Sequence, residues 1–208
     1  MRKIDWKLCM VADVEAAGAR FLPDLVDEAV KAGVTLVQLR AKTLDTGDFL
    51  YLAQKLAAIL KPRQIPFIIN DRLDIAQACD ADGVHLGQRD IPLVHARRIL
   101  GRKKLIGYSV STVNEAQTAA GADYLGVGPV YFTKSKQDLP KIVGTEGLKA
   151  IRKSAKNPIL AIGGIDLENI AEVMTTGIEG VAVISAILSA PNITQAVHRL
   201  QNALVPKQ

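Results

Sequence analysis

Apolar and polar residues form a regular pattern along the chain, in which short apolar runs alternate with longer amphipathic stretches eight times over. The short runs are rich in β-branched residues, which favours strands, and the longer stretches carry apolar residues at helical spacing. The expected strands lie near residues 8–12, 36–40, 66–70, 83–86, 105–109, 124–127, 158–162 and 180–184. The expected helices lie near residues 23–32, 48–60, 73–78, 93–100, 113–120, 146–154, 167–175 and 193–203. The pattern therefore predicts eight units, each a strand followed by a helix.

The residues that flank the expected helices support these positions. Thr112 is the expected N-cap of one helix, because Glu115 stands three residues later and completes the spacing of a capping box. A glycine commonly ends a helix, since it adopts the left-handed conformation at little cost. Glycines follow four of the expected helices in this way: Gly33, Gly101, Gly121 and Gly177.

The eight units predict an α/β fold built on a parallel sheet. Near-continuous apolar strands are typical of a sheet that is covered on both faces, and eight units in 208 residues are the number that closes a single-domain (β/α)8 TIM barrel. An open doubly wound sheet usually has fewer units and a glycine-rich fingerprint after its first strand, which residues 13–18 lack. No linker interrupts the pattern, so residues 1–208 are expected to form one domain.

Charge and composition change this picture little. The net charge of +5 raises the question of nucleic acid, but the densest basic cluster, residues 97–104, falls at a helix end and the following loop, where cations face water. Aromatic residues make up only 4% of the chain and do not alternate with basic ones, which disfavours a stacking surface for single strands. Small anionic substrates account for the excess charge equally well, and no nucleic-acid partner is expected.

The sequence also predicts no membrane partner and a cytoplasmic location. No apolar run approaches the roughly 18 residues of a membrane helix, and the first residues lack the apolar core of a signal peptide. Cys9 and Cys79 lie in apolar segments without partners at metal-ligand spacing. They are therefore expected to be free buried thiols rather than a disulfide.

Polar residues stand at the ends of the expected strands, where the active sites of such barrels lie. Gln38, Arg40 and Lys42 occupy alternate positions at the end of an apolar run, so their side chains point to one face of the strand. Unpaired buried charge costs roughly several kcal/mol, and an anion beside the two cations would remove this cost. Alternatively, Arg40 and Lys42 lie beyond the strand end in water.

Asp71 and Asp90 follow two neighbouring expected strands. Two carboxylates suit Mg²⁺, which takes one or two of them and completes its octahedron with water and substrate phosphate oxygens. Alternatively, each aspartate only caps the helix that follows it. The presence of Arg40, Lys42 and Lys136 near the same strand ends favours a metal together with pyrophosphate.

Gly163 and Gly164 follow the seventh expected strand, at a place where such barrels often bind phosphate through backbone amides. Ser185 begins the loop after the eighth strand. A glycine pair can also serve turn geometry alone, so that alternative stays open. A second anion site, separate from the first, would imply two phosphorylated ligands or one long ligand.

Residues 133–141 are rich in lysine and hydroxyl side chains, which is typical of a flap that closes on an anion and excludes water, or of a solvated loop. His85 lies within an apolar strand and is expected to be packed and hydrogen-bonded rather than to transfer protons. The sequence shows neither a Ser-His-Asp order nor a Cys-His pair, so a hydrolytic nucleophile is disfavoured.

Taken together, these motifs resemble the thiamine-phosphate synthase family, also called thiamine-phosphate pyrophosphorylases. The resemblance covers essentially the whole chain. It rests on Gln-Leu-Arg-Ala-Lys over residues 38–42, Asn-Asp over 70–71, the segment 82–90, Gly-Pro-Val-Tyr-Phe-Thr-Lys-Ser-Lys over 128–136, Ile-Gly-Gly-Ile over 162–165 and Ile-Ser-Ala-Ile over 184–187. Each motif alone is a weak signal, but six of them in order on eight strand-helix units are highly specific.

The resemblance implies a (β/α)8 transferase that joins hydroxymethylpyrimidine pyrophosphate to thiazole phosphate, or to its carboxylated form, and releases pyrophosphate. It implies that Mg²⁺ is bound by Asp71 and Asp90, and that the pyrophosphate is held by Gln38, Arg40, Lys42, Asn70 and Lys136. It places Ser109 near the pyrimidine and the leaving group, so the expected catalytic residues are Arg40, Lys136 and Ser109. It assigns the thiazole phosphate to Thr133, Ser135, Gly163 or Gly164, Ile184 and Ser185.

The chain departs from the family in two places. Arg89 stands where the family usually has an acidic residue, and Tyr131 and Phe132 stand where it often has Phe-Pro. Two rival functions use the same barrel. Thiazole tautomerases carry a histidine where this chain has Pro129 and lack the full pyrophosphate set, and a non-catalytic phosphate-ligand binder would not need the intact aspartate pair. The sequence leaves a homo-oligomer open.

Overall fold

The computed structural model describes residues 3–133 and 141–204. Eight parallel strands close into a barrel in the order of the sequence, which confirms the predicted fold. Each strand begins and ends within one residue of its expected position. The strands are β1 (Leu8–Asp13), β2 (Leu36–Arg40), β3 (Phe67–Asn70), β4 (Gly83–Leu86), β5 (Leu105–Val110), β6 (Tyr124–Val127), β7 (Ile159–Ile162) and β8 (Gly180–Val183).

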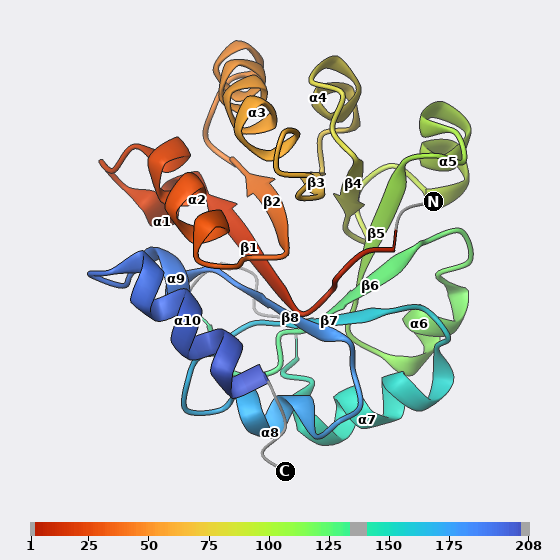
Figure 1. Ribbon diagram of the computed structural model, residues 1–208. Coiled ribbons are helices and arrows are strands. Elements are labelled where there is room, and N and C mark those ends of the chain that lie inside the picture. The colour runs from red at the N-terminus through yellow and green to blue at the C-terminus, as the bar shows by residue number, and fades with distance from the viewer. Residues whose placement is uncertain (1–2, 134–140, 205–208) are drawn as a thin grey trace.

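The helices form an outer ring around the strands (Figure 1). Along the described residues they are α1 (Val14–Ala17), α2 (Leu22–Lys31), α3 (Thr46–Leu60), α4 (Leu73–Ala78), α5 (Leu93–Leu100), α6 (Val113–Thr118), α7 (Gly144–Ser154), α8 (Ile170–Met174), α9 (Ser185–Leu188) and α10 (Ile193–Leu204). The sequence did not predict α1 and α9, which are single turns of four residues each. None of the described helices is long and apolar enough to cross a membrane.

The predicted signals at the helix ends are present. The Glu115 backbone N donates to Thr112 Oγ1 at 3.2 Å, and the Thr112 backbone N donates to Glu115 Oε2 at 3.3 Å, which completes the capping box of α6. Gly101 ends α5 with a φ of 70°, in the left-handed region that other residues seldom adopt. The remaining three glycines, Gly33, Gly121 and Gly177, also have positive φ.

Two cores hold the barrel together, one between strands and helices and one inside the barrel. Side chains alternate along each strand, and every strand except β4 contributes to both cores. The inner core consists of Cys9, Val11, Leu36, Ile68, Leu105, Tyr124, Leu160 and Ala182. Gln38 and Arg40 follow Leu36 at alternate positions and therefore point inward too. The inner face thus changes from apolar to polar toward the carboxyl ends of the strands.

Candidate active site

Arg40 is the last residue of β2, and its charge is balanced within the protein. Its Nη1 donates to the Asp13 carboxylate and lies 3.5 Å from Glu15 Oε2. Asp13 ends β1, is only 4% exposed, and also accepts a 2.8 Å hydrogen bond from the Ala16 backbone N at the start of α1. The counter-charge that was assigned to a bound anion from the sequence is therefore supplied to Arg40 by carboxylates of the protein.

Glu15 connects α1 to the loop after β2. Its Oε1 accepts hydrogen bonds from the Lys42 backbone N at 2.9 Å, the Thr43 backbone N at 3.0 Å and Thr43 Oγ1 at 2.8 Å. Partial burial opposes ionisation, but the hydrogen bonds, first that from the Thr43 hydroxyl, hold the pKa of Glu15 below its ordinary value. The loop that carries Lys42 is thus fixed by an ionised carboxylate.

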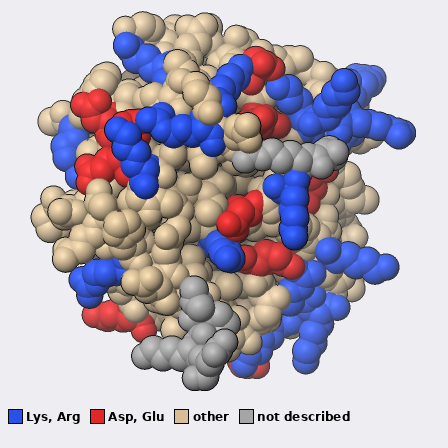
Figure 2. Space-filling view, in the orientation of Figure 1, with Lys and Arg blue, Asp and Glu red and all other residues tan. Residues whose placement is uncertain are grey.

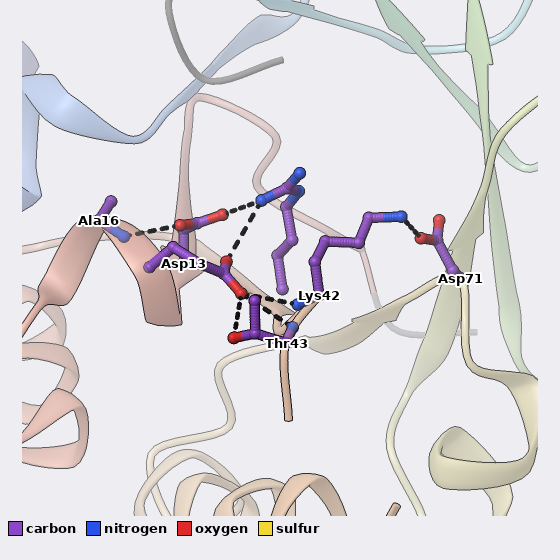
Figure 3. Close-up of polar contacts among 7 residues, drawn as sticks. Asp13, Ala16, Lys42, Thr43 and Asp71 are labelled. Carbon is purple, nitrogen blue, oxygen red and sulfur yellow. Dashed lines mark hydrogen bonds and ion pairs between the residues drawn. The ribbon is translucent and has the colours of Figure 1, made fainter. Parts of the chain in front are cut away.

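The Lys42 side chain extends from this loop to Asp71, with which it forms an ion pair (Figure 3). Asp71 follows β3 in the left-handed region, with a φ of 62°, and its backbone N donates to the His85 carbonyl at 2.8 Å. Aspartate is among the residues that tolerate this conformation. The turn directs the Asp71 carboxylate toward the carboxyl end of β4, where Asp90 lies.

Asp71 and Asp90 are in contact. Burial, followed by the charge of Asp71 and a hydrogen bond with it, raises the pKa of Asp90, although the Gly87 backbone N donates to Asp90 Oδ2 at 2.6 Å. The N-cap positions of α4 and α5 are Arg72 and Pro92, and neither aspartate side chain caps these helices. The capping interpretation is therefore wrong for both residues.

The aspartate pair fits a hard divalent cation. Two adjacent carboxylates repel each other, and a cation between them removes this repulsion and accepts their oxygens as ligands. No third His, Cys, Asp or Glu joins the pair among residues 3–133 and 141–204, so the protein supplies fewer ligands than a dedicated protein cage would. Such a site matches Mg²⁺, which keeps water and substrate oxygens as ligands.

Ser109 lies on β5 beside one histidine and one glutamine side chain. Its Oγ is 2.9 Å from His85 Nε2, and its carbonyl accepts a 2.7 Å hydrogen bond from Gln88 Nε2. His85 is 7% exposed, and its Nδ1 lies 3.0 Å from the Tyr124 hydroxyl. His85 is therefore packed and hydrogen-bonded, as expected. Asn70 lies opposite His85 in the β3–β4 register, at the same level of the barrel.

The rim at β7 and β8 contains backbone and hydroxyl groups. Gly163 and Gly164 have φ values of 99° and 65°, and the Gly163 carbonyl accepts a 3.0 Å hydrogen bond from the Tyr131 backbone N. Ile184 and Ser185 stand at the first turn of α9. Thr133 is the first residue of the expected flap and is described, whereas Lys134, Ser135 and Lys136 lie outside the described residues.

Sequence reasoning missed three residues near this site, namely Asp13, Glu15 and Tyr124. The strand-end rule could have found Asp13 and Glu15, because they follow the first expected strand. Tyr124 gave no comparable signal, since a tyrosine at the start of an apolar strand fits a core position equally well.

Eight parallel strands with a carboxylate pair and two cations at their carboxyl ends define a (β/α)8-barrel enzyme. A model of the thiamine monophosphate synthase family matches residues 8–187, so the chain belongs to this family. As a member, it is an enzyme and a transferase of thiamine biosynthesis.

Known proteins resemble the chain over nearly its full length. It is 49% identical to a thiamine-phosphate synthase of Clostridium acetobutylicum over 93% of this chain and 92% of the relative. It is 45% identical to a thiamine-phosphate synthase of Clostridium novyi over 96% of this chain and 98% of the relative. The solved structure of a thiamine phosphate pyrophosphorylase from Pyrococcus furiosus has a TM-score of 0.87 and 35% identity, and the match covers 96% of each chain. The predicted resemblance is thereby confirmed.

Proposed function

We propose that the chain joins hydroxymethylpyrimidine pyrophosphate to thiazole phosphate, or to its carboxylated form, and yields thiamine phosphate and pyrophosphate. The observation that carries this proposal is the cluster at the ends of β2 to β4. There, Lys42 is paired with Asp71 of the carboxylate pair, and Arg40 lies two residues before Lys42. Cationic groups and a candidate metal site therefore stand near one another. A pyrophosphate with Mg²⁺ needs both kinds of group.

The reaction proposed for this cluster is a substitution at the pyrimidine methylene. The carbon–oxygen bond breaks, and its electron pair leaves with the pyrophosphate. The aminopyrimidine ring delocalises the positive charge that remains on the methylene, and the lone pair of the thiazole nitrogen then forms the new carbon–nitrogen bond. The principal task of the protein is to stabilise the departing anion, and no strong general base is required.

We assign this task to the residues named by the resemblance. Arg40 is the fixed cation, because Asp13 and Glu15 orient its guanidinium. Lys42 pairs with Asp71, and we expect its ammonium to contact the pyrophosphate in the substrate complex. Asp71 and Asp90 would hold Mg²⁺, which when bound would supply further positive charge to the leaving group. Gln38, Asn70, Ser109 and Lys136 complete the proposed set, with Lys136 outside the described residues.

The thiazole phosphate is assigned to the opposite side of the rim. Gly163 and Gly164 adopt backbone conformations that favour glycine, and the absence of side chains allows an anion to approach their amides. Ile184 and Ser185 contribute the first turn of α9, and Thr133 and Ser135 belong to the expected flap. Two separate anion sites correspond to two phosphorylated substrates.

The setting proposed for this reaction is the cytoplasm. Cys9 and Cys79 are free and buried, as expected, which fits a compartment that keeps thiols reduced. Lysine and arginine side chains lie in separate groups among aspartate and glutamate on the face shown in Figure 2. We expect small phosphorylated molecules as partners, without nucleic acid or membrane.

The decisive experiment supplies the purified protein with both phosphorylated substrates and Mg²⁺. We expect thiamine phosphate and pyrophosphate in equal amounts, with loss of turnover when EDTA removes the metal and recovery when Mg²⁺ is added back. A parallel reaction with the carboxylated thiazole alone tests the rival function. Isomerisation of that compound, without any thiamine phosphate in the complete mixture, would replace our proposal with a thiazole tautomerase.

A further inference from the structure

A chain of four polar side chains crosses the barrel interior beneath the proposed site. Ser109 Oγ on β5 lies 2.9 Å from His85 Nε2 on β4, and His85 Nδ1 lies 3.0 Å from the Tyr124 hydroxyl on β6. The Tyr124 hydroxyl is in turn hydrogen-bonded by the side chain of Gln38 on β2. Three of the four side chains are buried, with exposures of 0% for Tyr124, 6% for Gln38 and 7% for His85.

Two glycines make room for the histidine and tyrosine rings. A Cβ at Gly107 would lie 2.2 Å from Tyr124 Cζ and 2.4 Å from His85 Nδ1, and a Cβ at Gly126 would lie 2.7 Å from His85 Cε1. Distances this short would force the rings to move. The Trp6 ring also packs against Tyr124, with 4.9 Å between ring centroids. The two rings are therefore confined to one arrangement, in which both nitrogens of His85 meet hydroxyl groups.

The four hydrogen-bonded side chains can order their donors and acceptors in two ways when the imidazole is neutral, which we call the first and second solutions. A neutral imidazole donates from one nitrogen and accepts at the other. In the first solution, Gln38 donates to Tyr124, Tyr124 donates to His85 Nδ1, and His85 Nε2–H donates to the Ser109 oxygen. In the second, every donor and acceptor is exchanged. Only the first leaves the Ser109 hydrogen free to donate to a further group.

A ligand that only accepts hydrogen bonds favours the first solution. Burial, with smaller contributions from neighbouring groups, raises the pKa of Tyr124 well above its ordinary value, so the hydroxyl keeps its proton and can donate in either solution. A pyrophosphate oxygen is an acceptor without a proton to donate, and a serine that faces it has to present its O–H. An apolar pair would fill the same volume without requiring buried hydrogen bonds. Packing alone therefore does not explain the four polar side chains, whereas a Ser109 hydroxyl that is free to donate at the site does.

We propose that His85 and Tyr124 are positioning residues, which hold the Ser109 hydroxyl as a hydrogen-bond donor toward the departing pyrophosphate. The inference rests on the proposed function, because that function places Ser109 beside the leaving group. His85 and Tyr124 act through Ser109 and do not touch the substrate. Their contribution is consequently lost whenever Ser109 is lost.

The first test is a double-mutant cycle. Tyr124→Phe keeps the ring and removes the hydroxyl. His85 Nδ1 then loses its hydrogen-bond donor, and the order of donors and acceptors from Gln38 to Ser109 is no longer fixed. We expect kcat to fall about tenfold, less than the loss of a direct donor, while both KM values stay within about twofold. In a Ser109→Ala background, Tyr124→Phe is expected to change kcat by less than about twofold. A tenfold loss in both backgrounds would show a general structural effect and would overturn the proposal.

Variants of His85 give a rescue test. His85→Gln keeps a side-chain N–H that reaches toward Ser109, whereas His85→Leu fills similar space without a donor. We expect His85→Gln to retain most of the turnover and His85→Leu to lose at least as much as Tyr124→Phe. Equal turnover in the two variants, with both confirmed as folded by thermal unfolding, would contradict a role through hydrogen bonding.

The last test does not depend on activity. Nitrogen-15 chemical shifts of the His85 imidazole report which ring nitrogen carries the proton, and we expect the Nε2–H form in the wild type and a mixture in Tyr124→Phe. An Nδ1–H form in the wild type would overturn the proposed order. Failure of the wild type to make thiamine phosphate would instead overturn the proposed function, so the two failures are distinguishable.

Discussion

The two sides of the barrel rim present different chemical groups. At the ends of β1 to β4, the groups are charged side chains, and Asp13, Arg40, Lys42 and Asp71 are already joined in ion pairs. At the end of β7, the groups are backbone amides of two glycines with positive φ. The first side has to exchange partners when a ligand arrives, whereas the second is set by the backbone itself.

This difference follows from what each side is proposed to bind. A leaving pyrophosphate gains charge during the reaction, and side-chain cations with a metal can respond to that change. A phosphate that only anchors its substrate needs no such response, and preformed amides bind it at a smaller entropic cost. We therefore expect substitutions on the charged side to affect kcat most and substitutions on the glycine side to affect KM most.

Arg40→Ala is expected to have the largest effect. It removes the fixed cation and leaves Asp13, which is almost fully buried, without its partner. We expect kcat to fall on the order of a hundredfold to a thousandfold, as for the loss of one group that stabilises a developing anion. The matched control is Arg63→Ala, which removes an arginine that pairs with Asp27 on the outside of the barrel and leaves kcat unchanged. Equal kcat values for the two variants would show that Arg40 does not stabilise the departing pyrophosphate.

Asp71→Asn is expected to come next, because it keeps the shape of the side chain and removes one carboxylate of the pair. We expect a loss of kcat/KM on the order of a hundredfold, together with a higher Mg²⁺ concentration for half-maximal turnover. A titration of turnover against Mg²⁺ measures both. Asp74→Asn is the control, since the Asp74 carboxylate pairs with Arg72. An unchanged Mg²⁺ requirement in Asp71→Asn would contradict the proposed metal site.

Gly164→Ala tests the glycine side. The added Cβ would lie 2.5 Å from the Phe132 carbonyl oxygen in a backbone with a φ of 65°, so the turn has to shift. We expect KM for the thiazole phosphate to rise about tenfold and kcat to change less than about twofold. Gly177→Ala is the control, because Gly177 has a φ of 80° with no atom within 4 Å of the added Cβ.

Both glycine variants are expected to lose at least about 1–2 kcal/mol of unfolding free energy, which is the cost of a side chain in a left-handed backbone. Only Gly164→Ala should change substrate binding. A rise in KM of similar size in both variants would show that the effect comes from lost stability. A loss confined to kcat in Gly164→Ala would contradict the expectation that the glycine side of the rim acts mainly on KM.

Asp13→Asn is expected to have a smaller effect on the charged side. Asparagine keeps the oxygen that caps α1 through Ala16, but it removes the charge beneath Arg40. We expect kcat/KM to fall about tenfold, because an outer partner orients the group that meets the substrate. Single-turnover rates and substrate affinity separate the two contributions. A gain of turnover would show instead that Asp13 competes with the pyrophosphate for Arg40.

Much of the fold was predictable because its signals are local. Apolar runs located each strand within one residue at either end, and Thr112 and Glu115 located the start of α6. The single-turn helices α1 and α9 were not predictable, since four residues are too few to show a helical period. Their positions depend on tertiary contacts at the rim.

The site was predictable where it depends on strand ends and not where it depends on contacts across the barrel. The strand-end rule placed Arg40, Lys42 and Asp71 at one end of the barrel. The ion pairs Arg40–Asp13 and Lys42–Asp71 follow from the relative placement of β1, β2 and β3. The link from Tyr124 to β2 and β4 exists only because the sheet closes into a barrel. No spacing along the chain encodes such a contact.

Asp80→Asn should have the smallest effect and concerns the opposite end of the barrel. Asp80 lies in the loop between α4 and β4 and accepts hydrogen bonds from Lys61 Nζ at 2.8 Å and Lys104 Nζ at 2.6 Å. Hydrogen bonds from Lys104 and Lys61 lower the pKa of Asp80 to about 2. Its ion pairs stabilise the fold above the ordinary aspartate pKa, near pH 4, and this contribution is lost as the pH falls toward 2.

We expect Asp80→Asn to lower the unfolding free energy at pH 7 by less than about 1 kcal/mol, because the side chain is 71% exposed and water screens its pairs. Asparagine tolerates the left-handed backbone at this position, where φ is 52°, so the change isolates the charge. Urea unfolding should separate variant and wild type at pH 7 and bring them together near pH 2, with kcat unchanged at pH 7. A change in kcat would mean that ion pairs at this end of the barrel affect the active site. Charges that contribute to turnover could then not be separated from charges that contribute only to stability.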